Sequence, residues 1–251
     1  MRYFLELSYN GKYFSGWQIQ KNQISIQETI EKCLSLILRK KITIVGASRT
    51  DSGVNAFQMF AHFDYFSVLK KKTFLKKINF ILPSYILIKN ILSVKPKANA
   101  RFDVISRHYQ YRINLYKGPF LYNYFNFPFR NLNYVLIKKA VLLLTSIEDF
   151  SSFGKKQDIN YFNTFKKCKL YSLTWQIRNR VIYIDIIANR FLRNMVRRII
   201  GAFLYIGIRK IKLLEFFLYV KSNQILLSCP SVPAKGLYLV RIIYPKNIFN
   251  F

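Results

Sequence analysis

The chain has 251 residues, of which 41 are Lys or Arg and 11 are Asp or Glu, so its formal net charge is +30. Hydrophobic residues make up 51% of the sequence and aromatic residues 17%. This share excludes a disordered basic tail, which would lack the apolar side chains for a core. A positive surplus this large repels itself unless a polyanion shares the surface, so nucleic acid is the first partner to consider and an acidic membrane the second.

Cysteine usage and apolar runs predict a reduced, cytoplasmic, soluble protein. The three cysteines, Cys33, Cys168 and Cys229, are widely spaced and form no C-x-x-C motif, which argues against a disulfide scaffold and against a zinc site. The longest clean apolar run, Ile199–Ile208, is much shorter than the roughly 20 residues that a membrane helix needs. An acid at Glu6 comes too early for a signal peptide.

The first hundred residues alternate between strand and helix patterns. Arg2–Tyr9 has the alternation of a strand and ends at an Asn-Gly turn. Ser25 and Glu28 form an S-x-x-E capping box, which predicts a helix beginning at Ser25. The elements expected next are strands at Ile42–Ala47 and Met59–Tyr65, a helix at Lys70–Phe80 and a strand at Ile86–Val94.

The second part of the chain repeats this rhythm. Two strand patterns, Leu170–Arg178 and Val181–Ala188, flank Asn179-Arg180 and predict a hairpin. A helix is expected from about Leu192. The remaining expected elements are a strand at Arg107–Tyr116, helices at Leu132–Leu144 and Ile211–Val220, and a last strand at Leu237–Tyr244.

The order of these elements predicts the fold class. Strands and helices interleave without a regular βαβ repeat, which favours an α+β fold with a largely antiparallel sheet flanked by helices. The similar order of elements on either side of residue 100 suggests an internal duplication, although no sequence self-similarity supports it. We therefore expect an N-terminal half at 1–100 and a C-terminal half at 101–251.

The turn Ser48–Gly53 contains an acid, Asp51, two residues after Arg49. One interpretation is structural: Asp51 caps its own backbone while Gly53 takes a positive φ. The other is catalytic, because a carboxylate on a phosphate-binding surface repels the ligand and needs a reason to be there. An arginine partner would hold such a carboxylate ionised and nucleophilic.

Strand alternation at 107–112 places Tyr109 and Tyr111 on one face and the polar side chains on the other. The structural interpretation is an aromatic core face and a solvated basic face. A functional one is that a tyrosine ring beside basic side chains stacks on an unpaired base. His108 has no partner that the sequence identifies, so we assign it to the solvated face and not to acid–base catalysis.

Two stripes are expected on the helix that follows Leu192. The apolar stripe consists of Phe191, Met195 and Ile199, and the basic stripe of Arg190, Arg193 or Asn194, and Arg197. A charged stripe of this kind is usually a solvated face. No acid occurs from Arg190 to Arg209, however, so repulsion along it destabilises the helix unless a phosphate or carboxylate lies against it.

These segments together resemble the tRNA pseudouridine synthase A family. The family loop G-R-T-D-A-G-V-H-A is similar to residues 48–56, which read S-R-T-D-S-G-V-N-A, with Ser52 in place of Ala and Asn55 in place of His. Further blocks match in the family's order along almost the whole chain. They are Tyr9–Gln18 with Ile26–Glu28, Ala100–Phe102, Arg107–Tyr111, Asp149–Phe153, Phe191–Arg197 and Gly236–Val240.

The resemblance implies a cofactor-free isomerase that converts uridines just 3′ of the anticodon of tRNA into pseudouridines. In this family's pattern Asp51 matches the catalytic nucleophile and Arg197 the basic residue paired with it. Arg49 matches the arginine linked to base flipping, and Tyr109 the tyrosine that packs on the target uracil. The resemblance also implies two related α/β halves whose sheets merge, and a homodimer that binds tRNA across both subunits.

The residue types suit this reaction. Isomerisation breaks the N1–C1′ bond and rejoins the uracil through C5 without net oxidation, so no cofactor or metal is required. Asp51 could attack C1′ or C6, or take a proton from C2′, and the sequence leaves these routes open. Two other functions stay open as well. They are an inactive tRNA- or rRNA-binding protein or RNA chaperone on the same scaffold, and a peripheral membrane protein, which the lack of a basic amphipathic terminus disfavours.

Overall fold

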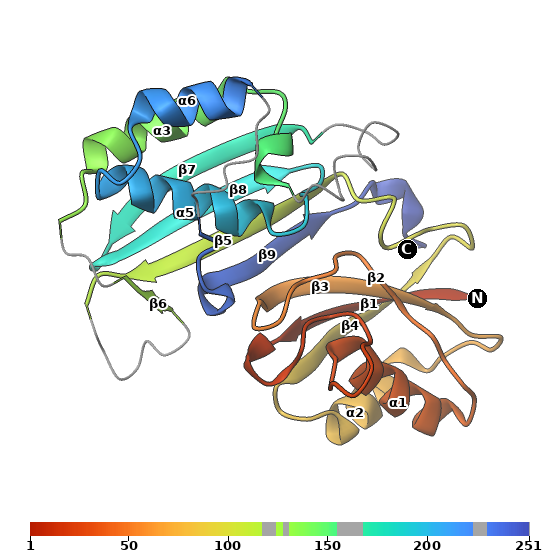
Figure 1. The fold of residues 1–251 in the computed structure, drawn as a ribbon. Coiled ribbons are helices and arrows are strands. Elements are labelled where there is room, and N and C mark those ends of the chain that lie inside the picture. Colours follow the sequence, from red (N-terminus) through yellow and green to blue (C-terminus); the bar gives the residue numbers. More distant parts are fainter. Residues whose placement is uncertain (117–123, 128–130, 155–167, 223–229, 251) are drawn as a thin grey trace. The chain divides into compact units, whose positions relative to one another are not determined.

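The computed structural model describes residues 1–116, 124–127, 131–154, 168–222 and 230–250 (Figure 1). The chain forms two compact units. The first unit consists of Met1–Arg107 together with Tyr238–Phe251, and the second of His108–Leu237.

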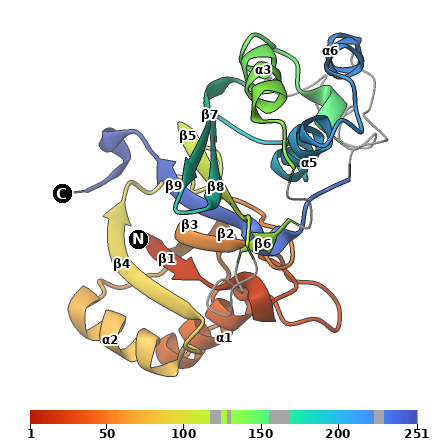
Figure 2. The same ribbon diagram turned by 90° about the vertical axis from the view of Figure 1, so that its left-hand side faces the viewer.

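The first unit contains a mixed sheet with strands in the order β4-β1-β3-β9. β1 pairs antiparallel with both β3 and β4, whereas β9 runs parallel to β3. Two helices, α1 and α2, lie on one face of these strands (Figures 1 and 2). The elements are β1 (Arg2–Tyr9), α1 (Ile26–Leu38), β2 (Val45–Gly46), β3 (Asn55–Asp64), α2 (Lys71–Ile81), β4 (Ile86–Val94) and β9 (Leu237–Ile243).

Helix α1 begins where its capping signal predicts. The Ser25 hydroxyl accepts a hydrogen bond from the Glu28 backbone N–H at 3.1 Å, which satisfies one of the donors that a helix start leaves open. The apolar stripe of the helix faces the sheet, and Ile26, Ile30 and Leu34 are fully buried. The prediction for this helix is confirmed.

The strand prediction around residues 42–65 is wrong in its bounds. Only Val45–Gly46 pairs as β2, while β3 begins at Asn55, four residues earlier than expected. The early start follows from pairing with strands distant in sequence. Asn55 and Ala56 lie opposite Tyr238 and Leu239 of β9, and Ala56 also lies opposite Tyr9 of β1. Local alternation of apolar residues carries no information about such a partner.

The second unit contains strands in the order β5-β8-β7, with the short β6 paired to β5. Asn179 and Arg180 both have positive φ, 49° and 63°, as the tightest hairpin turns require, so the predicted hairpin is confirmed. Helices α3, α5 and α6 lie on one face of these strands (Figure 1). The elements are β5 (Ser106–Asn114), β6 (Phe125–Asn126), α3 (Tyr134–Thr145), β7 (Leu170–Arg178), β8 (Val181–Ala188), α5 (Met195–Gly207) and α6 (Leu213–Lys221).

Helix α5 begins later than predicted. Asn194 has a left-handed backbone, with φ of 66°, so the helix cannot extend back through it to Leu192. Residues 190–194 therefore precede the helix, and the basic stripe expected along one helical face does not form. Met195 and Ile199 are buried as predicted, but Phe191 is only half-buried.

Two thiols lie in the interiors of the units. Cys33 is buried on α1, and burial raises its pKa. Cys168 is buried in the second unit, where its Sγ–H donates to the Arg190 carbonyl at 3.0 Å and burial raises its pKa to about 12. Both groups are therefore protonated at neutral pH.

Antiparallel pairing dominates within both units and helices flank the strands, so the predicted α+β class is confirmed. Within the described ranges, none of the helices combines the length and the apolar character that crossing a bilayer requires.

Candidate active site

The loop that carries Asp51 connects β2 to β3 in the first unit. It is anchored at Thr50, which is 7% exposed: the Thr50 hydroxyl lies 2.7 Å from the Tyr9 hydroxyl, and its carbonyl accepts from the Trp17 N–H at 3.0 Å. The Val54 N–H closes the turn on the Asp51 carbonyl at 3.2 Å, and Gly53 has the predicted positive φ, 79°. The backbone on both sides of Asp51 is thus fixed.

A second segment, residues 10–17, packs directly against this loop, and we name it the supporting segment. A Cβ on Gly11 would overlap the Val54 carbonyl, so only glycine allows the approach. Gly16 has φ of 102°, and a Cβ there would lie 2.8 Å from the Thr50 carbonyl oxygen. Backbone therefore lies on backbone at both ends of the supporting segment.

Asn55 fastens the supporting segment to the loop. Its side chain is 5% exposed, and Oδ1 accepts from the Gly11 N–H at 2.9 Å. This residue stands where the family pattern has His, and its amide supplies the acceptor that a buried N–H needs. The departure from the pattern thus has a structural role here.

The acidic candidate and the basic candidate of the loop differ in solvent exposure. Asp51 is half-buried, whereas Arg49 is exposed. A carboxylate held on a fixed backbone can attack an atom or accept a proton at a fixed point. A guanidinium open to solvent can instead reach toward a large anionic substrate.

The second unit holds the other two candidates, Tyr109 and Arg197. Tyr109 is 7% exposed and contacts Phe191 edge-on, with ring centroids 5.1 Å apart and planes at 89°. Two residues along β5, the buried Tyr111 donates its hydroxyl hydrogen to the Pro233 carbonyl at 2.7 Å. Burial raises the pKa of Tyr111, and the charge of Arg197 acts in the opposite direction.

Arg197 lies in the first turn of α5, where its Nε donates to the Val232 carbonyl at 2.7 Å. The structure therefore brings Arg197 and the Tyr109–Tyr111 face of β5 into one site within the second unit. The other two candidates, Asp51 and Arg49, lie on one loop of the first unit.

A polar network on the opposite face of β5 was missed from the sequence. The two faces of β5 are as predicted, but the prediction that His108 is solvated is wrong. Its Nε2 lies 2.7 Å from Asp185 Oδ1 on β8. Gln110 donates to the same oxygen at 2.9 Å. Burial raises the pKa of Asp185, but the hydrogen bonds from His108 and Gln110 outweigh burial and lower it. The one available signal was that Asp185 is an acid within an otherwise apolar strand.

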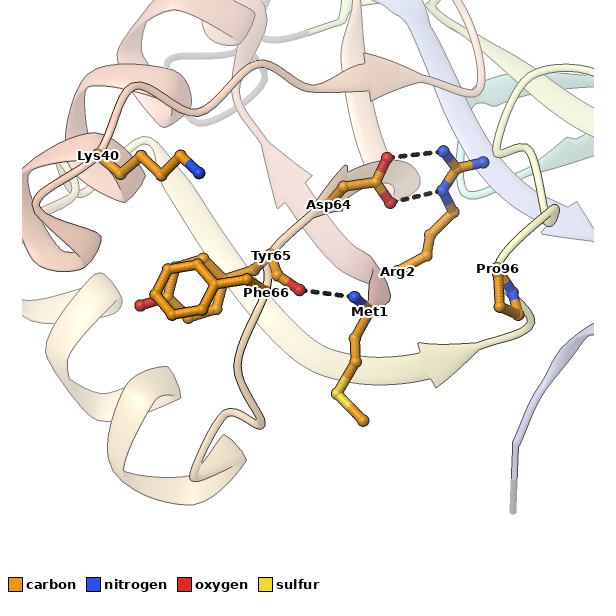
Figure 3. Close-up of a pocket in the computed structure, with 7 residues that line it drawn as sticks. All are labelled: Met1, Arg2, Lys40, Asp64, Tyr65, Phe66 and Pro96. Carbon is orange, nitrogen blue, oxygen red and sulfur yellow. Dashed lines mark hydrogen bonds and ion pairs between the residues drawn. The ribbon is translucent and has the colours of Figure 1, made fainter.

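A pocket of about 500 Å³ lies elsewhere in the first unit (Figure 3). The Arg2 guanidinium there binds both carboxylate oxygens of Asp64, at 2.9 and 2.7 Å. None of the four predicted site residues lines this pocket, and its arginine already has an acidic partner. Its lining consists of Met1, Arg2, Lys40, Asp64, Tyr65, Phe66 and Pro96.

Among the residues that the structure describes, no three His, Cys, Asp or Glu side chains are grouped so as to hold a metal ion. The side chains present are instead a carboxylate, arginines and a buried tyrosine pair on a strongly basic α+β scaffold. A scaffold with a net charge of +30 suits a polyanionic partner such as nucleic acid.

Comparison with known proteins specifies the family. Residues 147–245 match the family model described as tRNA pseudouridine synthase. Three relatives named tRNA pseudouridine synthase A align over nearly their whole length. The protein from Azobacteroides pseudotrichonymphae genomovar. CFP2 is 42% identical over 99% of both chains, that from Porphyromonas gingivalis 37% over 99% of both, and that from Parabacteroides distasonis 38% over 99% of this chain and 98% of its own. The chain belongs to the tRNA pseudouridine synthase A family.

Proposed function

We propose that this protein isomerises uridine to pseudouridine in the anticodon arm of tRNA, with Asp51 as the nucleophile. The observation that carries the proposal is the fixed backbone around Asp51, which a turn serving only as a connection does not need. Backbone bonds at Thr50 and Val54 and the two glycines of the supporting segment hold one carboxylate in place. The names of the relatives and the net charge of +30 support tRNA as substrate.

The bond changes balance without a redox partner. The N1–C1′ bond breaks, the uracil turns, and C5 bonds to C1′. C5 then loses its proton while N1 gains one from solvent, so the product is an isomer of the substrate. Asp51 provides the carboxylate for the step that labilises the glycosidic bond.

Arg49 serves the step before chemistry. The target base must leave the helical stack, at a cost of a few kcal/mol. An exposed guanidinium on the same loop as Asp51 can occupy the vacated space and bind phosphate in the same movement. Its exposure in the first unit supports this role.

Tyr109 and Arg197 serve the detached base and the carboxylate. A ring held edge-on by Phe191 offers a fixed surface for the free uracil, which makes rejoining effectively intramolecular. Arg197, oriented through Nε by the Val232 carbonyl, matches the basic residue that the family pattern pairs with the catalytic carboxylate.

We further propose that the enzyme acts in the cytoplasm as a homodimer, which the family resemblance and the reduced cysteines support. Sedimentation equilibrium tests the assembly. A species of about twice the 29.9 kDa chain mass is expected, and a monomer at all concentrations would contradict it.

Tritium release from [5-³H]uracil-labelled tRNA tests the reaction, because C5 loses its hydrogen only when pseudouridine forms. Asp51→Asn should abolish release while tRNA binding persists. The matched control is Asp103→Asn in the same unit, which changes the charge equally but keeps an oxygen for the Asn99 N–H. No release by the wild-type enzyme bound to tRNA would exclude the reaction, and full release by Asp51→Asn would exclude this nucleophile.

A further inference from the structure

Two tyrosine rings lie exposed at the surface of the first unit. Tyr13 and Tyr85 are 50% and 40% exposed, and their ring centroids are 4.0 Å apart with planes at 35°. The Lys12 ammonium lies 5.2 Å from the centre of the Tyr13 ring. We name these three residues the tyrosine platform. The platform leaves aromatic surface exposed to water beside a positive charge, although burying that surface would be favourable.

The tyrosine platform is attached to the Asp51 loop. Tyr13 belongs to the supporting segment, whose Gly11 and Gly16 pack on the loop backbone. Tyr85 joins the same segment through its carbonyl, which accepts from the Asn10 N–H at 2.9 Å. The Tyr13 Cα therefore lies within about 8 Å of the Gly11 Cα, because consecutive Cα atoms are about 3.8 Å apart.

An RNA strand that reaches Asp51 also passes the supporting segment, because that segment packs on the Asp51 loop. Bases in one strand rise by only about 3.4 Å each when stacked, so a nucleotide within a few positions of the one at Asp51 can reach the tyrosine platform. Aromatic rings stack on any unpaired base because every base has a π-face, and an ammonium beside them binds the phosphate. A paired base offers no free face, so the occupant is an unpaired nucleotide.

Exposure alone does not mark such a site. Phe80 on α2 is 92% exposed, yet no described contact joins it to the supporting segment or to the Asp51 loop. Attachment to the loop that carries the nucleophile distinguishes Tyr13 and Tyr85.

We propose that the tyrosine platform is a subsite for an unpaired nucleotide of the RNA substrate, within a few positions of the uridine that Asp51 engages. Tyr13 and Tyr85 stack on its base, and Lys12 binds its phosphate. The identity of the RNA rests on the proposed function, whereas the binding itself is measured independently of turnover.

The test uses the full-length enzyme and an RNA hairpin with the sequence of a tRNA anticodon arm. One loop nucleotide within a few positions of the target uridine is replaced by 2-aminopurine, whose fluorescence falls when it stacks. Tyr13→Ala and Tyr85→Ala should each weaken hairpin binding about tenfold. Each should also abolish the quenching of 2-aminopurine fluorescence that stacking on the tyrosine rings adds when the enzyme binds. Tyr13→Phe should retain both, and Phe80→Ala serves as the matched control on an exposed aromatic residue.

The outcomes separate the possibilities. Wild-type affinity and quenching in Tyr13→Ala and Tyr85→Ala would overturn the proposal. Equal weakening toward a fully paired RNA duplex would also overturn it, because the subsite requires an unpaired base. If Tyr13→Ala does not fold, Tyr13→Leu replaces it. If the wild-type enzyme releases no tritium, the proposed function fails, but the binding comparison still decides the subsite.

Discussion

The loop of the first unit and the strand–helix pair of the second unit fix their candidate side chains by different means. The Asp51 loop is held by backbone on backbone, with Gly11 and Gly16 removing the side chains that would intervene. In the second unit, side chains bond to carbonyls: Arg197 to Val232 and Tyr111 to Pro233. The first arrangement tolerates no added atom, and the second depends on donors that can be removed one at a time.

The two histidines of the chain have different kinds of partner. His62 is 6% exposed in the first unit, and its Nδ1 accepts from the Ala100 backbone N–H at 3.1 Å. His108 in the second unit bonds to a side chain, Asp185.

The largest effect is expected from Gly11→Ala. Its Cβ would overlap the Val54 carbonyl, and a backbone atom cannot turn aside as a side chain does. We expect a loss of about 3 kcal/mol in the free energy of unfolding and at least a hundredfold loss of tritium release, from displacement of the loop. Urea unfolding and the release assay measure these. The control is Gly154→Ala, whose added Cβ has the flexible Leu192 side chain as its nearest neighbour, at 3.0 Å. An equal loss of stability and of tritium release in the two variants would contradict backbone overlap as the cause.

Arg197→Lys tests the side-chain arrangement. Lysine keeps the charge but lacks the planar fork, which donates to the Val232 carbonyl through Nε and has further N–H groups to offer a substrate or a carboxylate. Tritium release should fall about a hundredfold, the usual loss for one oriented donor, with a stability loss of about 1 kcal/mol. Arg178→Lys on the exposed hairpin is the matched control. Near wild-type turnover in Arg197→Lys would show that a point charge suffices.

Asp185→Asn should lower the free energy of unfolding by about 1 kcal/mol at pH 7, because it weakens partly exposed hydrogen bonds. The pKa of Asp185 is lower in the folded protein than in the unfolded chain. The contribution of ionised Asp185 to stability is therefore present above its pKa in the unfolded chain. It is lost as the pH falls through its pKa in the folded protein. Urea unfolding between pH 7 and 3 measures this. A double-mutant cycle with His108→Gln assigns the coupling, and zero coupling would contradict the pair.

His62→Asn should have the smallest effect at neutral pH, because the amide oxygen replaces Nδ1 as acceptor for the Ala100 N–H. Burial, followed by the charge of Arg2, lowers the pKa of His62. In the wild-type protein, the contribution of His62 to stability is fully present above its unfolded pKa of about 6.5. It is lost as the pH falls through the lower pKa of His62 in the folded protein. The variant should lack this slope, and parallel pH profiles would contradict the assignment.

Local signals predicted the elements whose causes are local. The start of α1 follows from Ser25 and Glu28, which are three residues apart, and the β7–β8 hairpin from the two adjacent residues that take positive φ. In both cases the interacting groups are neighbours in sequence, so the pattern contains the whole interaction.

The errors have causes distant in sequence. The early start of β3 depends on β9, and the partner of His108 is 77 residues away. Asn194 misled in another way: polar residues at helical spacing predicted a helix, but its backbone is left-handed. For the candidate site, Asp51, Arg49, Tyr109 and Arg197 were chosen from motifs, and their catalytic roles stay predictions. The contacts of Gly11 and Asn55 that hold the loop became visible only in the fold.

The protonated thiols of the two units have a practical consequence for labelling experiments. Thiolates, not thiols, react with maleimides, so Cys33 and Cys168 should label slowly in the native protein. With Cys229 replaced by Ser, one new surface cysteine in each unit would accept a dye while the interior stays unmodified. Energy transfer between the two dyes would then report how RNA changes the distance between the halves of the enzyme.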